Sequence, residues 1–210
     1  MSNQPSEPTP PRPYRQTLRA AKTEHTRRRI TEAALALHEE IGPARASISA
    51  VAKRAGVERP TVYRHFPDER SLLAACRGHS MLLHPPPTPD GWIEIEDPVE
   101  RLRIALASLY AYYGETEQLT ANLLRDAAIS TAVAEAIGMM SAALKAVVEL
   151  LATGWSTAPD RASTVQAALE HAISFDTWRS LCRRSALDER TAIELMVGLV
   201  RSAASLAPET

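Results

Sequence analysis

Apolar positions recur at three- and four-residue spacing from about Glu24 onward, which predicts a succession of amphipathic helices. The first helix is expected to start near Glu24, and Gly42 with Pro43 is expected to stop it. Its apolar stripe is formed by Ile30, Ala33, Ala34, Leu37 and Ile41.

The later helices are predicted from the same spacing and from helix-breaking residues. One helix leaves the first third of the chain and runs to about Leu83, where the prolines of residues 84–90 interrupt it because they fix φ and lack a donor. Asp97 is expected to cap, and Pro98 to open, a helix that ends near Gly114. Further helices are expected at about residues 116–126, 130–153, 160–184 and 188–205. Short connecting loops favour an antiparallel bundle, so the predicted fold class is all-α.

Residues 47–66, SISAVAKRAGVERPTVYRHF, read as two short helices joined by a tight turn. Ser47 is expected to cap the first helix, which buries a stripe through Val51 and leaves Lys53 facing water. Gly56 ends this helix, because glycine takes the left-handed conformation without a Cβ penalty.

The second helix of the pair opens near Glu58 and tolerates Pro60 in its first turn, where the missing N–H has no helical partner. Val62 and Phe66 lie four residues apart and are expected to face the core. The opposite face carries donors for phosphate oxygens and base edges, namely Arg59, Thr61, Tyr63, Arg64 and His65. This pattern indicates a recognition helix, although similar helix pairs also occur in helical proteins that never touch nucleic acid.

Charge placement favours the DNA-binding interpretation. Residues 1–70 hold 13 Lys+Arg against 8 Asp+Glu, whereas residues 71–210 hold 11 against 17, so the net charge of -1 conceals two parts of opposite sign. A basic first third can neutralise phosphates and release counterions, which is the main sequence-independent source of DNA affinity. Arginine runs are often only solvated helix faces, but next to this helix pair Arg27 and Arg28 are predicted phosphate contacts.

The helix that starts near Glu24, the pattern ISAVAKRAGV and the run TVYRHFPDERSLL together resemble the TetR family of transcriptional regulators over about residues 24–76. The resemblance implies that Thr61 and Tyr63 contact phosphates and that Phe66 is the core plug beneath the end of the recognition helix. The predicted DNA-binding residues are Arg27, Arg28, Ser47, Lys53, Arg59, Pro60, Thr61, Tyr63, Arg64 and His65.

One position departs from the family pattern. The lysine that commonly follows the phenylalanine by three residues is replaced by Glu69, with Arg70 beside it. A phosphate contact from this turn is therefore in doubt.

Three regions are predicted from these patterns. Residues 1–22 are proline-rich and polar without apolar periodicity, so we expect a disordered N-terminal arm. Its basic residues Arg12, Arg15, Arg19 and Lys22 are compatible with DNA contact or with a merely solubilising tail. Residues 23–70 are predicted to be a helix-turn-helix, three-helix DNA-binding domain, and residues 71–210 a helical-bundle domain for effector binding and dimerisation.

The last two helices are the predicted dimer interface. Wide apolar stripes mark them: Val165, Ala168, Leu169, Ala172, Ile173 and Leu181 in one, and Ala192, Ile193, Leu195, Met196, Leu199, Val200 and Ala203 in the other. In TetR-like proteins the corresponding helices of two subunits pair, so the resemblance implies a homodimer and a near-palindromic operator. The alternative is that these stripes complete the core of each monomer.

The resemblance also implies a pocket for an unknown small-molecule effector in the middle helices. Aromatic, methionine and polar side chains at helical spacing are the candidates, and core packing accounts for most of them equally well. The predicted ligand-binding residues are Tyr110, Tyr113, Asn122, Arg125, Met139, Trp155, His171, Phe175 and Trp178, with Met140 beside them.

Other classes of protein receive little support. No uninterrupted apolar run approaches 18 residues and the start lacks the order of a secretory signal, so we expect a cytoplasmic protein without a membrane partner. Cys76 and Cys182 lie far apart with no metal-site spacing, so free thiols and no cofactor are expected. Catalytic motifs are missing, so no enzyme is predicted. The predicted function is a dimeric repressor that a small molecule releases from double-stranded DNA. A helical protein-interaction module and a ligand-independent DNA binder are the alternatives.

Overall fold

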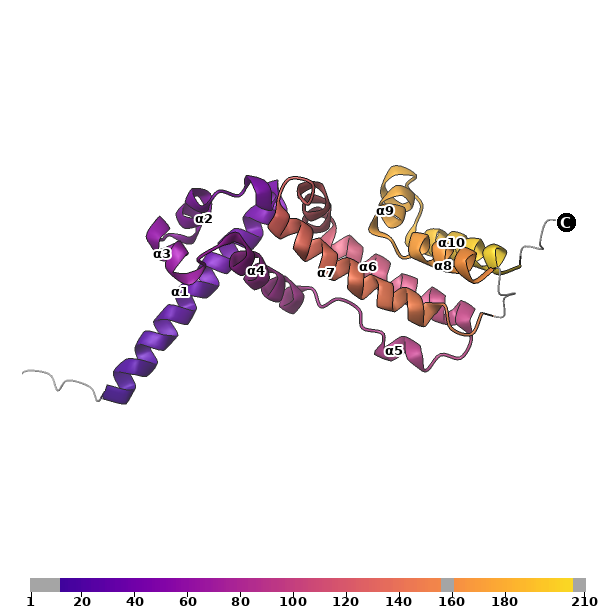
Figure 1. The fold of residues 1–210 in the computed structure, drawn as a ribbon, viewed down its shortest axis with the longest axis horizontal. Coiled ribbons are helices and arrows are strands. Elements are labelled where there is room, and N and C mark those ends of the chain that lie inside the picture. The colour runs from indigo at the N-terminus through magenta and orange to yellow at the C-terminus, as the bar shows by residue number, and fades with distance from the viewer. Residues whose placement is uncertain (1–11, 156–160, 206–210) are drawn as a thin grey trace, which may run out of the picture.

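The computed structural model describes residues 12–155 and 161–205, and within these ranges every regular element is helical (Figure 1). The elements are α1 (Arg12–Ile41), η1 (Pro43–Arg45), α2 (Ile48–Ala55), α3 (Arg59–His65), α4 (Glu69–Leu83), α5 (Asp90–Ile93), α6 (Pro98–Asp126), α7 (Thr131–Leu151), α8 (Ala162–Ala172), α9 (Phe175–Trp178), η3 (Arg179–Arg184) and α10 (Glu189–Ser205). The predicted all-α fold class is confirmed.

Helix α1 is longer than its apolar stripe predicts. It has 30 residues and begins at Arg12 instead of near Glu24, so the prediction of a disordered arm is wrong for residues 12–22. Pro13 lies in the first turn, where proline is tolerated, and neither glycine nor proline follows it before Gly42. Good helix formers such as Leu, Arg, Ala and Lys continue the helix without an apolar face. Residues 1–11 lie outside the described residues.

The first core joins α1, α2, α3 and α4. Ile30, Val51 and Val62 have no exposed surface, and Phe66 and Leu72 are almost fully buried beside them. The capping box at the start of α4, in which Asp68 accepts from the Ser71 N–H, sets the direction in which this helix leaves the core. Helix α4 ends at Leu83, as predicted.

The second core is built mainly on α6, which runs for 29 residues. The predicted helix end at Gly114 is wrong, because the helix continues to Asp126. One glycine in a helix interior costs about 1 kcal/mol, and burial of Tyr110 and Tyr113 before it and Thr116 after it outweighs that cost. The short helix α5, which the sequence pattern did not predict, adds the buried Trp92 to this core.

The single helix predicted at 160–184 is divided. Helix α8 ends at Ala172, Ser174 caps the short helix α9 by accepting from the Thr177 N–H (3.1 Å), and η3 continues as a π-helical turn. This break turns Phe175 and Trp178 into the second core, where Trp178 has no exposed surface. Local capping and aromatic burial therefore override the helical spacing.

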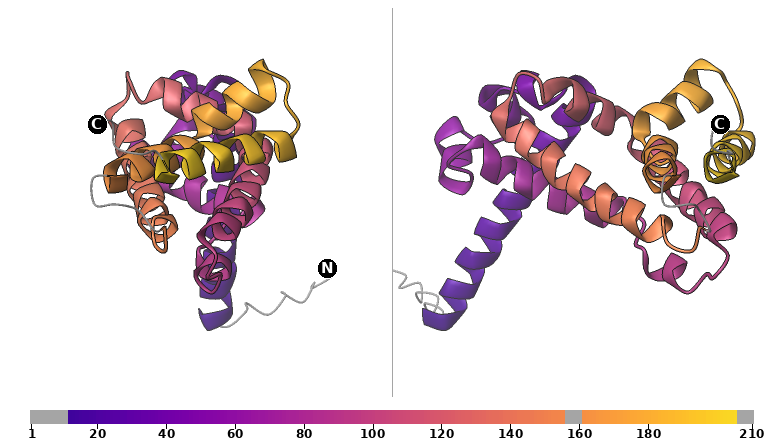
Figure 2. Two further views of the ribbon diagram at one scale, coloured as in Figure 1. Left: turned by 90° about the vertical axis from the view of Figure 1, so that its right-hand side faces the viewer. Right: turned by 45° about the vertical axis from the view of Figure 1, so that its right-hand side comes forward.

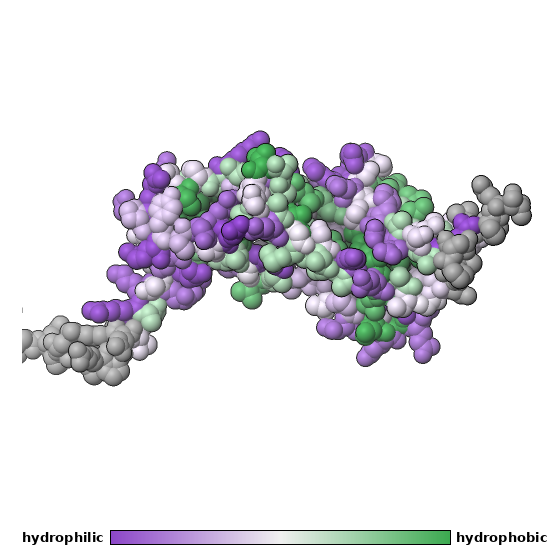
Figure 3. Space-filling model, in the orientation of Figure 1, coloured by the Kyte–Doolittle hydropathy of each residue, from purple (hydrophilic) through white to green (hydrophobic). Residues whose placement is uncertain are grey.

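The molecule is elongated, and the surface of its α1–α3 end is mostly hydrophilic (Figures 1 and 3). The α1–α4 unit occupies one end, α6 and α7 run along the length, and α8 and α10 lie side by side at the other end (Figures 1 and 2). Helix α7 is long and apolar enough to meet the length and composition criterion of a membrane span, which the sequence pattern did not predict. It packs against α4, α6 and α8 in the bundle, and Glu135, Lys145 and Glu149 interrupt its apolar sequence.

Candidate nucleic-acid interface and effector region

The turn between α2 and α3 has the geometry of a helix-turn-helix. The Ser47 hydroxyl accepts from the Ala50 N–H (3.2 Å) and caps α2. Gly56 ends the helix in the left-handed conformation with φ 62°, and the Val57 N–H donates to the Ala52 carbonyl (3.0 Å). These contacts form the glycine-terminated end predicted from sequence, and they aim the start of α3 away from the core.

Helix α3 presents one face to solvent and the other to the core. Val62 and Phe66 are buried, whereas Arg59, Pro60 and Arg64 are exposed and Tyr63 is 47% exposed. Guanidinium and phenol groups on an exposed, rigidly backed helix can donate to phosphates and base edges. Of the remaining predicted residues, Ser47 and Lys53 are exposed on α2, and Thr61 and His65 are half-buried on α3.

His65 lies where α3 meets α1. Its pKa is lowered, first by burial and then by the positive charges of Arg64 and Arg27, with Glu24 opposing them. The ring is therefore neutral at pH 7 and can both donate and accept a hydrogen bond.

The three arginines near the middle of α1 have different partners. Arg27 donates to the His65 carbonyl (2.8 Å), and its guanidinium carbon lies 4.2 Å from the centroid of the Phe66 ring. Arg28 is exposed and lies 3.5 Å from the Glu32 carboxylate. Arg29, which was not among the predicted residues, donates to the Ala55 carbonyl at the end of α2. Arg27 and Arg29 thus hold α1 against both helices of the motif, whereas Arg28 pairs with Glu32 on α1 itself.

The departure at Glu69 and Arg70 has a structural explanation. Glu69 accepts a hydrogen bond from the Ser130 hydroxyl (3.0 Å), and Arg70 donates to the Glu135 carboxylate on α7 (2.6 Å). Both side chains of this turn are therefore used to attach the α1–α4 unit to the second domain.

Four of the predicted ligand-binding residues form an aromatic cluster, namely Tyr110, Tyr113, Phe175 and Trp178. The Tyr113 and Phe175 rings meet edge to face with centroids 5.5 Å apart, and the Phe175 and Trp178 centroids are 5.4 Å apart. The Tyr110 hydroxyl donates to the Ala172 carbonyl (2.9 Å) and the Tyr113 hydroxyl to the Ile173 carbonyl (2.7 Å). Burial raises the pKa of both tyrosines, with smaller contributions from neighbouring groups.

The indole N–H of Trp178 is buried within this cluster and has no hydrogen-bond partner among the described residues. A buried donor without a partner costs free energy, so an acceptor atom placed beside this N–H would stabilise the cluster.

The other predicted ligand-binding residues lie apart from the centre of the cluster. His171 is exposed at its edge, with Nδ1 3.3 Å from the Thr177 hydroxyl. Trp155 is half-buried at the end of α7 and donates to the Leu151 carbonyl (2.9 Å). Met139 is 52% exposed on α7, and Met140 is half-buried beside it.

Asn122 and Arg125 belong to a junction between the two domains. Asn122 donates to the His38 and Glu39 carbonyls (3.0 and 2.7 Å), and Arg125 donates to the Ile41 carbonyl (2.9 Å). The end of α6 thus holds the last carbonyls of α1, and the His38 carbonyl also accepts from the Gly42 N–H (3.0 Å).

Asp126 completes this junction and was not predicted. Its buried carboxylate accepts from the Ala44 N–H (3.0 Å) and from Arg125 (2.7 Å). Burial raises its pKa, but these hydrogen bonds and the charges of Arg125 and Arg45 outweigh that effect and hold it below the ordinary value. No local motif marks the junction role of Asp126, because its backbone partner Ala44 lies 82 positions earlier in the chain.

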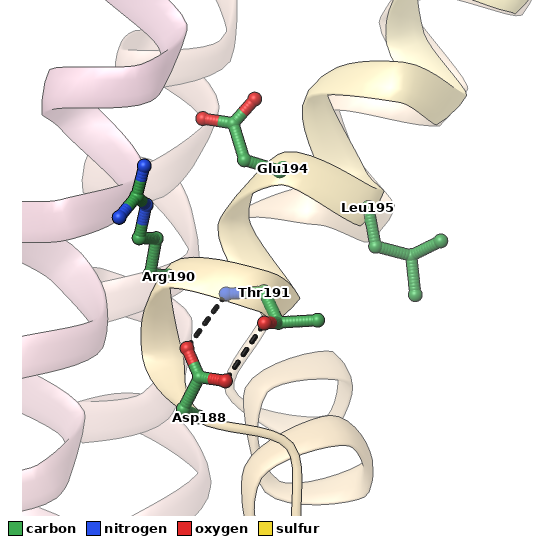
Figure 4. A pocket seen from close by; sticks show the side chains of 5 residues that line it. All are labelled: Asp188, Arg190, Thr191, Glu194 and Leu195. Atoms are coloured by element: carbon green, nitrogen blue, oxygen red, sulfur yellow. Dashed lines mark hydrogen bonds between the residues drawn. The ribbon is translucent and has the colours of Figure 1, made fainter.

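An open hollow of about 660 Å³ lies at the start of α10, and none of the four aromatic side chains of the cluster lines it (Figure 4). It is lined by Asp188, Arg190, Thr191, Glu194 and Leu195, at the start of α10. Asp188 caps this helix by accepting from the Thr191 N–H and hydroxyl (2.9 and 2.7 Å). Among the described residues no group of His, Cys, Asp and Glu side chains could hold a metal ion, and Cys76 and Cys182 are free and buried.

Comparison with known proteins gives matches of two kinds. Residues 30–76 match the family model described as bacterial regulatory proteins, tetR family. An uncharacterized HTH-type transcriptional regulator of Mycobacterium tuberculosis is 47% identical over 47 residues, which are 22% of this chain and 25% of the relative. The matched part thus spans about a quarter of the length of this curated relative.

Solved structures extend the likeness to most of the chain. A transcriptional regulator from Rhodococcus sp. RHA1 is 23% identical with a TM-score of 0.57, over 87% of this chain and 99% of its own. The SmeT–triclosan complex is 20% identical with a TM-score of 0.57, over 89% and 98% of the two chains. At these identities the likeness establishes a common fold. Residues 30–76, which include the helix-turn-helix, are thus similar to bacterial regulatory proteins of the tetR family, and most of the chain shares its fold with the solved regulators.

Proposed function

We propose that this protein is a dimeric, cytoplasmic transcriptional repressor that binds a near-palindromic DNA operator and leaves it when a small molecule enters the second domain. The observation that carries the proposal is the exposed face of α3, where Arg59, Tyr63 and Arg64 project from a helix whose other face is buried. Such a helix can enter the major groove without losing its own packing.

The proposed dimer forms through α8 and α10. Of the apolar stripe on α10, Ile193, Met196 and Val200 are buried in the core of the monomer, whereas Leu195 and Leu199 are 50% and 41% exposed. The buried residues of the stripe complete the core of the monomer, and we assign the exposed leucines to the proposed dimer interface. The two exposed leucines lie four residues apart on one face, and a second copy of the same helix would cover them.

The proposed effector region is the aromatic cluster of Tyr110, Tyr113, Phe175 and Trp178. SmeT, a relative by fold, has been solved with triclosan, a small molecule. A comparable ligand would have to separate closely packed rings here, and an acceptor atom on it would satisfy the Trp178 N–H. Such a ligand favours the conformation in which the cluster is open, in proportion to its preference for that state.

Helix α6 connects this region to the DNA-binding unit. It carries Tyr110 and Tyr113 in its middle, and at its end Asn122 and Asp126 hold the end of α1 and the following turn. The link from α4 to α7 through Arg70 and Glu135 is a second route. The proposed coupling thus uses two contacts between the domains, that of α6 with α1 and that of α4 with α7. Helix α4 takes part in the second of them.

The first test is a gel shift with the DNA directly upstream of the gene, in the presence of nonspecific competitor. We expect a salt-sensitive shift that Arg59→Ala, Thr61→Ala and Tyr63→Ala together abolish. Arg184→Ala with Thr164→Ala, two exposed positions of the second domain, is the matched control and should leave the shift intact. Absence of any salt-sensitive binding, to this or to unrelated duplexes, would contradict the proposal and favour a protein-interaction module.

A further inference from the structure

The first half of α1, residues 12–26, projects from the body of the protein (Figures 1 and 2). Thr17 and residues 19–25 are exposed, and among the residues from 19 onward the first fully buried side chain is Ile30. At a rise of about 1.5 Å per residue the projecting half is roughly 22 Å long. A helix without an apolar face gains nothing from burial in the monomer, so its sequence has to be explained by other contacts.

The charge of the projecting half has one sign over most of its length. Residues 12–22, RPYRQTLRAAK, hold four basic residues and no acidic residue. Arg19 and Lys22 are exposed, and neither forms an ion pair or side-chain hydrogen bond within the described part of the chain. This contrasts with Arg27 and Arg29, whose guanidinium groups are bound to the helix-turn-helix.

The spacing aligns these basic positions. Positions 12, 15, 19 and 22 follow steps of three and four, so they share one side of the helix. The same three- and four-residue steps continue from Lys22 through Thr26 to Ile30 and Leu37. Ile30 and Leu37 are buried in the core that α1 forms with α2, α3 and α4. The basic stripe is therefore on the side of α1 that bears the helix-turn-helix.

The projecting half also emerges beside the end of α3. Arg27, one residue beyond it, donates to the His65 carbonyl in the last turn of that helix (2.8 Å). Direct contacts between α1 and the end of α3 thus set the position of the stripe relative to the candidate recognition helix.

We propose that the projecting half of α1 is a second DNA-binding element, whose basic stripe contacts backbone phosphates that flank the site occupied by α3. This inference rests on the proposed DNA-binding function and adds a sequence-independent contact to it. A stripe about 15 Å long matches roughly four base-pair steps at 3.4 Å each. The partner is the phosphate backbone, because cations at helical spacing bind phosphates without regard to base sequence.

The test is the salt dependence of DNA binding by the full chain carrying Arg19→Gln and Lys22→Gln. Glutamine keeps helix propensity, and circular dichroism checks that the helix remains. The matched control is Lys145→Gln with Arg184→Gln, which removes the same charge from exposed positions of the second domain. Binding to two duplexes of about 40 base pairs, one from the upstream DNA and one unrelated, is followed by anisotropy from 0.05 to 0.3 M KCl.

The slope of log K against log salt should fall by about 0.9 for each lost phosphate contact, hence by about 1.8 per protomer, on both duplexes. Affinity at 0.1 M salt should weaken more than tenfold, while the control stays as wild type. Arg19→Lys, which keeps the charge, should restore the slope at that position.

An unchanged slope and affinity in the glutamine variant would overturn the inference. If the Arg59, Thr61 and Tyr63 variant still abolished specific binding in that case, the proposed function would stand without it. Failure of the wild-type protein to bind either duplex at 0.05 M KCl would instead refute the proposed function itself.

Discussion

Acidification should destabilise this protein through one buried histidine, His38. This residue lies near the end of α1, is only 4% exposed and contributes its carbonyl to Asn122 at the junction of the domains. Burial lowers the pKa of His38 from 6.5 to about 4, and the negative charge of Asp126 opposes this only in part. The imidazole is therefore neutral in the folded protein.

The direction of the effect follows from linkage. Between pH 6.5 and about 4 the unfolded chain binds a proton at this histidine and the folded chain does not, so stability is complete above pH 6.5 and is lost as the pH falls. Integration between those two pKa values gives a loss of about 2 kcal/mol at pH 5 and about 3 kcal/mol at pH 4. A loss of this size is a large fraction of the stability of an ordinary domain.

The assay is urea unfolding at pH 8 and pH 5, at one fixed protein concentration because a dimer's stability depends on it. The variant His38→Leu removes the titrating group and leaves an apolar side chain of similar volume at this buried position. It should lose about 2 kcal/mol less than wild type between the two pH values, whatever its stability at pH 8. His25→Gln, at an exposed position of α1, is the control and should behave as wild type. An equal loss of stability in wild type and His38→Leu would refute the assignment of a buried neutral histidine.

Two further predictions concern single contacts. Gly42→Ala should lower the free energy of unfolding by about 2 to 4 kcal/mol in urea titrations, because φ at this position is 92° and a Cβ would lie 2.1 Å from the Arg125 Nη2 and 2.4 Å from the Asp126 Oδ2. Tyr113→Phe should lower it by about 1 kcal/mol, since the buried Ile173 carbonyl loses its donor.

Each of these variants has a matched control. Gly138 is exposed on α7 with free space around it, so Gly138→Ala should leave stability unchanged or raise it by up to about 1 kcal/mol. Tyr63 is half-exposed, and Tyr63→Phe should leave stability unchanged. A Gly42→Ala protein as stable as wild type would contradict the close packing of the junction, and an unchanged Tyr113→Phe protein would contradict the buried hydrogen bond.

Much of the α1–α4 unit could be predicted from local signals. A cap residue, an apolar stripe and a glycine determine α2 and its end, since each acts within one or two turns of the chain. The same kind of reasoning failed for the start of α1, where helix propensity alone extends the helix, and at Gly114, where burial on both sides outweighs a weak helix former.

The candidate site shows a similar division. The sequence by itself determined the helical class, the exposed and buried faces of α3 and the basic character of the first third, because all three follow from periodicity and charge. Only the tertiary structure decided that Arg27 supports α3, that Glu69 and Arg70 face the second domain, and that Asn122 belongs to the junction. Each of these roles depends on a partner 38 to 84 residues away in the chain, and the spacing of neighbouring residues carries no information about a partner so distant.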